Sequence, residues 1–335
     1  MAAHATTTTR EVHWTLDGVE IDATLVRPAG DGTFSGVVFV AGSGPTDRNW
    51  NSPLLPGANG SAALLADACA AAGFASIRYD KRASGPRAQA TIAAMAGRVS
   101  MRAHVDELAG AIGQLVREPG VRRDRLFAIA NSEGTLHALN YQLHDPPIPL
   151  AGLVLIAPPG RSVGAVARAQ LAAQLAAQLT AVPEGDAILA RYDSAIAKFV
   201  AGEEVSLDPA LPAGVQGLLQ ALTAPVNLPF TRELWTSDGA SLLRRIGIPT
   251  LVVIGEKDIQ VDWKDDGSIL QEATRGREHV TFAFPPNANH VLKHEARPRP
   301  HLTAQAALSY NDAEASLDPE GARIVLEWLA QQTSH

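Results

Sequence analysis

The sequence has very little cysteine: Cys69 is the only one in 335 residues. A chain with one cysteine forms no internal disulfide and builds no cluster of thiolate ligands around a metal. This composition is typical of proteins that work in a reducing compartment, so we expect a cytoplasmic location. Cys69 lies in an alanine-rich run, where we expect it to fill space in the core.

An excess of positive charge is also missing. The chain has 28 lysines and arginines against 35 aspartates and glutamates, which gives a formal net charge of -7. A chain of this sign has no general attraction for phosphate backbones. We therefore expect no nucleic acid partner.

Long apolar runs are absent as well. No window approaches the roughly 18 uncharged apolar residues that a membrane-spanning helix needs, so we expect no membrane span. Residues 1–9 lack the basic start and apolar core of a secretory signal. We expect them to form a flexible tail.

Motifs for cofactors are not found either. No spacing of histidine, cysteine and carboxylate residues suggests a metal site. The segment Gly42-Ser43-Gly44 lacks the lysine and the third glycine of nucleotide-binding loops. We expect neither a metal nor a cofactor.

The part of the sequence that is informative about fold is an alternation of apolar runs and helical patterns. Such alternation predicts a mostly parallel sheet with helices on both faces, here formed by residues 10–158 and 248–333. Residues 11–16 and 19–26 resemble a hairpin around Asp17-Gly18. Further strands are expected at 36–41, 74–79, 126–131, 150–156, 250–254 and 280–284, and helices at 61–72, 100–116, 132–139 and 319–330.

Residues 159–247 interrupt this alternation because they contain no good strand. Helical patterns cover 162–179 and 186–200, and partly 207–222. Strands resume afterwards in the same pattern, so we predict a helical cap over one edge of the sheet. The alternative is a separate helical domain with a structural role.

One short segment carries the main chemical hypothesis. A buried apolar run enters Ala130-Asn131-Ser132-Glu133-Gly134 and continues as a helix. This is the pattern of a nucleophile elbow, in which a serine sits on a tight strand-to-helix turn between small residues. The alternative is a serine that only caps the helix.

A serine nucleophile needs a base, and the base needs an orienting acid. Asp258 follows the strand at 250–254, with Glu256 and Asp262 as competitors for the acid. His290 follows the strand at 280–284, with His294 as its competitor. Serine, acid and histidine thus occur in the expected order, each after a strand of one parallel sheet.

These residues resemble the α/β-hydrolase superfamily over nearly the whole chain. Ala41-Gly-Ser-Gly-Pro-Thr-Asp-Arg48, Tyr79-Asp-Lys-Arg82 and Gly255-Glu-Lys-Asp258 are similar to motifs of a bacterial carboxylesterase branch described as dienelactone-hydrolase-like or serine-aminopeptidase-like. The resemblance implies an α/β-hydrolase fold with a helical cap. The branch usually has histidine at position 131, glycine at 135 and glycine at 83. Here those residues are Asn131, Thr135 and Ala83. We expect these differences to affect the range of substrates and not the class of reaction.

The resemblance also implies an oxyanion hole formed by the backbone N–H groups of Ser43 and Glu133. Gly42 and Gly44 allow the loop to approach a substrate closely. Asn131 and Gly134 would support the site, and Arg82 is a candidate partner for the Glu133 carboxylate. The wider charged set of Asp47, Arg48, Asp80, Lys81 and Arg82 predicts an ion-pair network behind the site.

Together these features predict a serine hydrolase that cleaves carboxylic esters through an acyl-enzyme. The cap is rich in Ala, Leu and Val, so we expect small-to-medium apolar or aromatic esters as substrates. A peptidase or a thioesterase could use the same triad, and a non-catalytic binding protein is a further alternative. The sequence leaves open whether the protein forms a homodimer.

Overall fold

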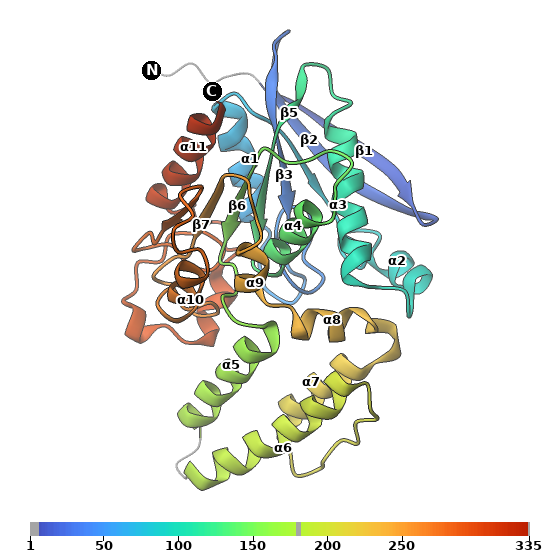
Figure 1. The fold of residues 1–335 in the computed structure, drawn as a ribbon, viewed down its shortest axis with the longest axis vertical. Helices are drawn as coiled ribbons and strands as arrows, with labels where there is room; N and C mark the ends of the chain where they lie inside the picture. Colours follow the sequence, from blue (N-terminus) through green and yellow to red (C-terminus); the bar gives the residue numbers. More distant parts are fainter. Residues whose placement is uncertain (1–6, 179–181, 334–335) are drawn as a thin grey trace.

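A computed structural model describes residues 7–178 and 182–333 (Figure 1). Within these residues lies one eight-stranded sheet of order β1-β2-β4-β3-β5-β6-β7-β8. β2 is antiparallel to β1 and β4, and the other neighbouring pairs are parallel. The predicted mostly parallel α/β sheet is confirmed. The strands are β1 (Thr7–Leu16), β2 (Val19–Pro28), β3 (Phe34–Val40), β4 (Ala75–Tyr79), β5 (Val121–Asn131), β6 (Gly152–Ile156), β7 (Thr250–Val253) and β8 (Val280–Ala283).

The first two strands form the predicted hairpin. Asp17 and Gly18 both have positive φ, 52° and 77°, as the tight turns that suit twisted hairpins require. The expected tail over 1–9 is wrong at its end, because residues 7–9 pair with 26–28 in β2. Cross-strand hydrogen bonding holds this part of the chain, and residues 1–6 lie outside the described residues.

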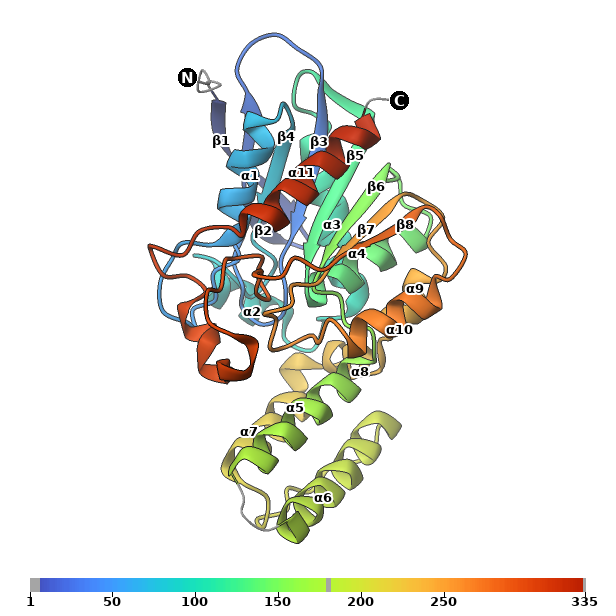
Figure 2. The ribbon, with the colours of Figure 1, turned by 90° about the vertical axis from the view of Figure 1, so that its left-hand side faces the viewer.

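Helices cover both faces of the parallel part of the sheet. β6 and β7 are buried at every residue, as expected for apolar strands between two helical layers. α1 (Ser61–Ala71) and α11 (Pro319–Thr333) cover one face (Figure 2). α3 (Met101–Leu115), α4 (Glu133–Leu143) and α9 (Gly239–Leu243) cover the other, with α10 (Asp265–Ala273) against α9.

Side chains cap two helix starts. Ser100 Oγ accepts a hydrogen bond of 3.1 Å from the N–H of Ala103 and caps α3. Asp318 Oδ1 accepts one of 2.8 Å from the N–H of Gly321 in α11.

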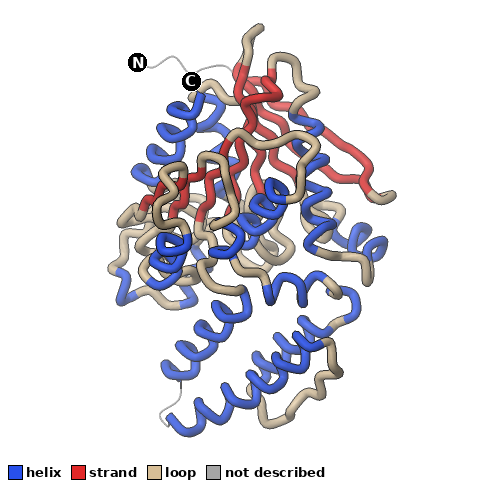
Figure 3. Tube along the Cα trace, viewed as in Figure 1, coloured by secondary structure: helices blue, strands red, loops and turns tan. Residues whose placement is uncertain are grey.

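A helical insertion projects from the sheet between β6 and β7. Its helices are α5 (Val163–Gln178), α6 (Val182–Ala201), α7 (Ala213–Thr223) and α8 (Phe230–Thr236), with a 3-10 turn at Pro225–Asn227. Figure 3 shows this part as helix and loop, away from the strands. It has its own apolar core, which includes Tyr192, Phe199 and Trp235. We call residues 163–236 the helical insertion.

The predicted cap range of 159–247 is longer than the projecting part. α9 packs against α4 and α10 and so belongs to a layer of the main body. Two hydrogen bonds, each with a backbone N–H as donor, hold α8 to the start of α3. Phe230 donates to the carbonyl of Val99 (3.0 Å), and Met101 donates to the carboxylate of Glu233 (2.7 Å).

The segment of residues 293–317, between β8 and α11, is an irregular excursion. Its helical pieces are 3-10 turns at Arg299–His301 and Ala304–Ser309. Asn59, in the loop after β3, donates its side-chain N–H groups to the carbonyls of residues 312, 313 and 315. Lys293 Nζ donates to the Asn59 carbonyl. The excursion over 293–317 is therefore tied to the loop that follows β3.

In the described residues, no helix combines the length and apolar character needed to cross a membrane.

Candidate active site

Ser132 sits at the sharp turn between β5 and α4. Its backbone has φ 53° and ψ -124°, a conformation that is strained for a non-glycine residue and typical of functional positions. Its neighbours Asn131 and Glu133 are buried, whereas Ser132 is partly exposed. Its side chain makes no capping hydrogen bond within the described part of α4. The structure thus disfavours the alternative in which Ser132 only caps the helix.

Small residues allow this turn to form. A Cβ atom placed on Gly134 would lie 2.6 Å from the carbonyl oxygens of Val40 and Ala41, so only glycine lets α4 start this close to β3. Ala130 is fully buried beneath the turn. A Cβ on Gly42 would lie 3.3 Å from the Cβ of Ser132, which places the Gly42 loop beside the serine.

Asp258 and His290 are joined directly at the same sheet edge. His290 Nδ1 lies 2.8 Å from Asp258 Oδ2, and both residues are buried. Asp258 Oδ1 accepts from the N–H groups of Gln260 (2.7 Å) and Val261 (3.0 Å). With both carboxylate oxygens engaged, Asp258 is fixed and an ionised carboxylate there accepts from an Nδ1–H of His290.

Asn131 connects the histidine loop to the elbow. Its Nδ2 donates 2.9 Å to the carbonyl oxygen of His290. The residue beside Ser132 therefore holds the backbone of His290. This residue is asparagine here, where the carboxylesterase branch that the sequence resembles usually has histidine.

The competing residues have other partners. Asp262 Oδ1 accepts from the N–H groups of Lys264 and Asp265 at the start of α10. His294 Nδ1 lies 3.2 Å from Asp318 Oδ2, and the histidine side chain is 42% exposed. Glu256 is half-buried in the turn before Asp258. Of these residues, only Asp258 and His290 form a buried acid–histidine pair.

The proposed oxyanion donors are unpaired among the described residues. The N–H groups of Ser43 and Glu133 donate to no protein group there. Ser43 is exposed, whereas Gly42 is buried against the elbow. Both N–H groups are thus available to an acceptor beside Ser132.

The Glu133 side chain is held by Lys81 and His137, not by Arg82. Lys81 Nζ lies 3.6 Å from Glu133 Oε1, and His137 Nε2 lies 3.1 Å from the same oxygen. The prediction of Arg82 as the partner is wrong. Arg82 instead binds the carboxylates of Glu107 and Asp17 and the carbonyl of Ala103.

Burial and the neighbouring positive charge have opposite effects on the pKa of Glu133. Burial alone raises the pKa of Glu133, but the Lys81 ammonium and the His137 hydrogen bond outweigh it and lower the pKa to about 2. Burial lowers the pKa of His137 to about 4 against the opposing effect of Glu133. At neutral pH an ionised Glu133 therefore accepts from a neutral His137.

A buried polar cluster continues behind the elbow. The rings of His104 and His137 have centroids 4.7 Å apart, and His104 Nδ1 lies 2.9 Å from Glu107 Oε2. Phe230 of the insertion packs edge-on against His104 with a centroid distance of 4.7 Å. Sequence reasoning missed His104, Glu107 and the role of His137, because helical periodicity alone assigns them to packing.

Within the described residues, the wider charged set forms ion pairs, as predicted, except for Asp47. Arg48 binds Asp80 through Nε (3.0 Å) and also binds Glu11. Asp47 accepts from the N–H groups of Asn49 and Asn51 and fixes the loop after β3. These contacts fix the loop that follows β3.

One group in the described residues could bring three metal ligands together. His13, Glu20 and Asp22 on the β1–β2 hairpin place ligand atoms within 4.8 Å of one another. Arg87 already occupies this place, with Nε 2.9 Å from Asp22 Oδ2 and Nη1 3.3 Å from Glu20 Oε2. A guanidinium there opposes binding of a second cation.

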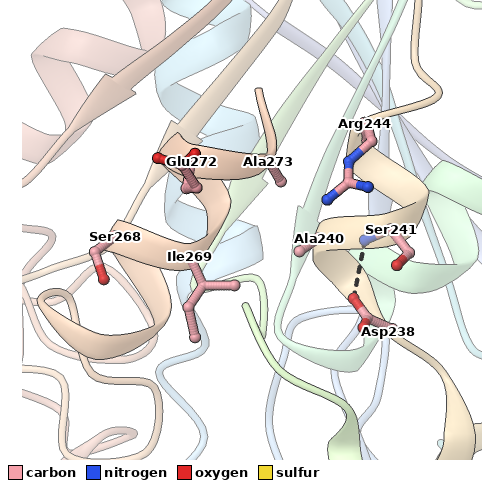
Figure 4. Close-up of a pocket in the computed structure, with 8 residues that line it drawn as sticks. All are labelled: Asp238, Ala240, Ser241, Arg244, Ser268, Ile269, Glu272 and Ala273. Carbon is pink, nitrogen blue, oxygen red and sulfur yellow. Dashed lines mark hydrogen bonds between the residues drawn. The ribbon is translucent and has the colours of Figure 1, made fainter. Parts of the chain in front are cut away.

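Two surface hollows lie away from Ser132, Asp258 and His290. One of about 480 Å³ is lined by α9 and α10, including Asp238, Arg244 and Glu272 (Figure 4). In it Asp238 Oδ1 accepts from the N–H of Ser241 (2.9 Å). The other, of about 400 Å³, lies in the insertion between α5, α6 and α8. Neither is lined by Ser132, Asp258 or His290.

A parallel sheet with a strained serine between a central strand and the next helix defines a class of enzymes, the hydrolases of the α/β type. The chain belongs to the alpha/beta hydrolase family, whose profile matches residues 37–306. The family that the sequence motifs predicted is confirmed.

Several proteins are similar to this chain. The esterase EstD of Thermotoga maritima is 27% identical over 281 residues, which cover 83% of this chain and 59% of that protein. A solved esterase from Pyrococcus furiosus has a TM-score of 0.54 at 15% identity, over 97% of this chain and 91% of its own. A solved 2,6-dihydroxy-pseudo-oxynicotine hydrolase has a TM-score of 0.54 at 14% identity, over 96% and 68%. The solved structures confirm the α/β-hydrolase fold.

Proposed function

We propose that this protein is a serine hydrolase that cleaves carboxylic esters through an acyl-enzyme. The observation that carries the proposal is the buried Asp258–His290 pair at the edge of the sheet where Ser132 occupies a strained turn. A serine, a histidine and an oriented carboxylate are the groups that nucleophilic acyl transfer needs. The esterase name of the Thermotoga maritima relative supports the same class.

The mechanism follows from these roles. His290 takes the proton of Ser132 Oγ as the oxygen attacks the ester carbonyl, and Asp258 stabilises the imidazolium that forms. The oxyanion accepts from the unpaired N–H groups of Ser43 and Glu133. His290 then gives its proton to the leaving alcohol. A water molecule, activated by the same histidine, releases the acid and regenerates Ser132.

The helical insertion is proposed as a cap that shapes the substrate site. It starts directly after β6, at the sheet edge that carries the triad, and α5 is rich in alanine and leucine. We infer a preference for small-to-medium apolar or aromatic esters. A peptidase or a thioesterase on the same triad is the second candidate, since scissile amides and thioesters need the same groups.

Hydrolysis of a chromogenic acetate or butyrate ester tests the nucleophile. Ser132→Ala should lower kcat by roughly 10⁶-fold, the loss seen when another serine hydrolase loses its nucleophile. Ser100→Ala is the matched control, because that serine does cap a helix; it should keep its kcat. Equal rates for wild type and Ser132→Ala would contradict the proposal and favour a non-catalytic role for Ser132.

The two candidate bases are separated by a second pair of variants. His290→Ala removes the imidazole that contacts Asp258 and should lose nearly all activity, whereas His294→Ala removes only a half-exposed contact to Asp318. Steady-state kinetics with the same ester measure both. A larger loss in His294→Ala than in His290→Ala would reverse the assignment.

A further inference from the structure

Lys81 has an unusual pair of partners just behind the elbow. It is the second residue after β4, and its side chain is 8% exposed. Its Nζ donates to the carbonyl oxygen of Gly42 and lies 3.6 Å from Glu133 Oε1. One ammonium group therefore contacts both segments to which the proposed function assigns the oxyanion donors.

The contact with Gly42 bears on the Ser43 N–H through the geometry of the peptide bond. The Gly42 C=O and the Ser43 N–H belong to one planar trans peptide group, in which the two bonds point in opposite directions. A cation fixed on the oxygen therefore sets the direction of the N–H, away from Lys81. It also polarises the peptide, which strengthens the N–H as a donor.

The contact with Glu133 reaches the second donor. Glu133 is the first residue of α4, and its own N–H is the other unpaired donor. Its carboxylate is held by Lys81 on one side and by His137, one turn along α4, on the other. The Glu133 carboxylate thus holds the Lys81 ammonium. The same ammonium orients the Gly42–Ser43 loop, which faces the backbone of Glu133.

We propose that Lys81 is a positioning residue for the oxyanion hole, where it fixes the Gly42–Ser43 peptide against the start of α4 through Glu133. This inference rests on the proposed ester hydrolysis at Ser132. It assigns Lys81 a role that its neighbour Arg82, bound to Glu107 and Asp17, does not share.

The test compares Lys81→Met with the double variant Lys81→Met/Glu133→Gln. The single variant leaves a buried carboxylate without its cation, which is costly for folding. The double variant removes both charges, keeps the Glu133 backbone N–H and still lacks the donor to Gly42. Arg27→Met is the matched control, because Arg27 also binds a carboxylate, Glu118, and the carbonyls of Pro28 and Gly30. Arg27 lies at the opposite edge of the sheet, since β2 runs antiparallel to β4.

Kinetics on an ester and on the matching thionoester give the decisive readout. Sulfur is a weak acceptor, so a thionoester gains less from the oxyanion hole than an ester does. We expect kcat for the ester to fall roughly 10- to 100-fold in both Lys81 variants with KM nearly unchanged, less than the loss of a whole donor. The loss for the thionoester should be smaller, so the ester-to-thionoester ratio of kcat should fall. Arg27→Met should leave both rates unchanged.

Three outcomes would overturn the inference. If the folded double variant keeps the wild-type kcat while hydrolysis still requires Ser132, Lys81 does not position the donors and only this inference fails. If ester and thionoester lose rate equally, the role of Lys81 is structural. If hydrolysis persists in Ser132→Ala, the proposed function and the role of Lys81 fail together.

Discussion

At the scale of single residues, the site depends on carboxylate–histidine pairs in which each buried side chain needs the other as its partner. Asp258 with His290 and Glu133 with His137 are each nearly inaccessible to water. An unpaired ionised carboxylate in either place would be strongly unfavourable. The Lys81 ammonium and the hydrogen bond from His137 therefore lower the pKa of Glu133.

The Glu133–His137 pair predicts a specific dependence of stability on pH. His137 has a pKa near 6.5 when unfolded and about 4 in the structure. Between these values the unfolded chain binds a proton that the folded chain does not. The stability that the neutral His137 contributes should thus be complete above pH 6.5. The free energy of unfolding should fall as the pH drops from 6.5 to 4.

His137→Gln tests this, because glutamine retains an N–H donor for Glu133 but does not titrate. Urea unfolding at pH 7.5 and pH 5 should show a smaller loss of stability on acidification in His137→Gln than in wild type. The exposed His144→Gln should follow the wild type. An identical pH dependence in wild type and His137→Gln would show that His137 is not buried in its neutral form.

At the scale of elements, the close contact of α4 with β3 builds the site. Parallel strands bring their carboxyl ends to one edge, so the positions of Ser132, Asp258 and His290 after β5, β7 and β8 could be predicted from the sequence. The partner of Glu133 could not. Lys81 and Arg82 are adjacent in sequence, and which of them points towards α4 depends on the path of the loop, where Ala83 adopts a φ of 68°.

Four helices of the described residues, α2 (Ala88–Met95), α8, α9 and α10, were not predicted from the sequence. α2 has no side-chain cap, and Thr91 and Met95 are its buried residues. A short helix with little burial leaves no clear periodic pattern.

Gly134→Ala tests the contact between α4 and β3. The new Cβ would meet two backbone oxygens at 2.6 Å, so α4 must move away and carry Ser132 and the Glu133 N–H with it. We expect a loss of about 1–3 kcal/mol in stability, typical of overpacking, together with a fall in kcat.

Gly113→Ala, within α3, is the control for a glycine-to-alanine change in a helix. A Cβ added at Gly113 would have no atom within 4 Å, so this variant should gain about 0.5–1 kcal/mol through helix propensity. Thermal unfolding and ester kinetics measure both variants. If Gly134→Ala is as stable and active as Gly113→Ala, the close approach of α4 to β3 is not required.

At the scale of the whole molecule, segments distant in sequence meet around one sheet edge. Phe230 brings the helical insertion onto the histidines of α3 and α4. Asn59 and Lys293 tie the excursion after β8 to the loop after β3. The sequence predicted the insertion, but these contacts join segments that are distant in the chain and have no local pattern. The insertion and the excursion therefore both connect to elements that carry site residues.

The most direct test of this account is to identify the residue that reacts with an acyl-transfer probe. The folded protein is treated with a p-nitrophenyl alkylphosphonate, and the modified peptide is found by digestion and tandem mass spectrometry. The account predicts one phosphonyl group per chain, on Ser132, with little or no labelling in His290→Ala. An adduct on another residue, or ester hydrolysis by a protein whose Ser132 stays unmodified, would contradict it.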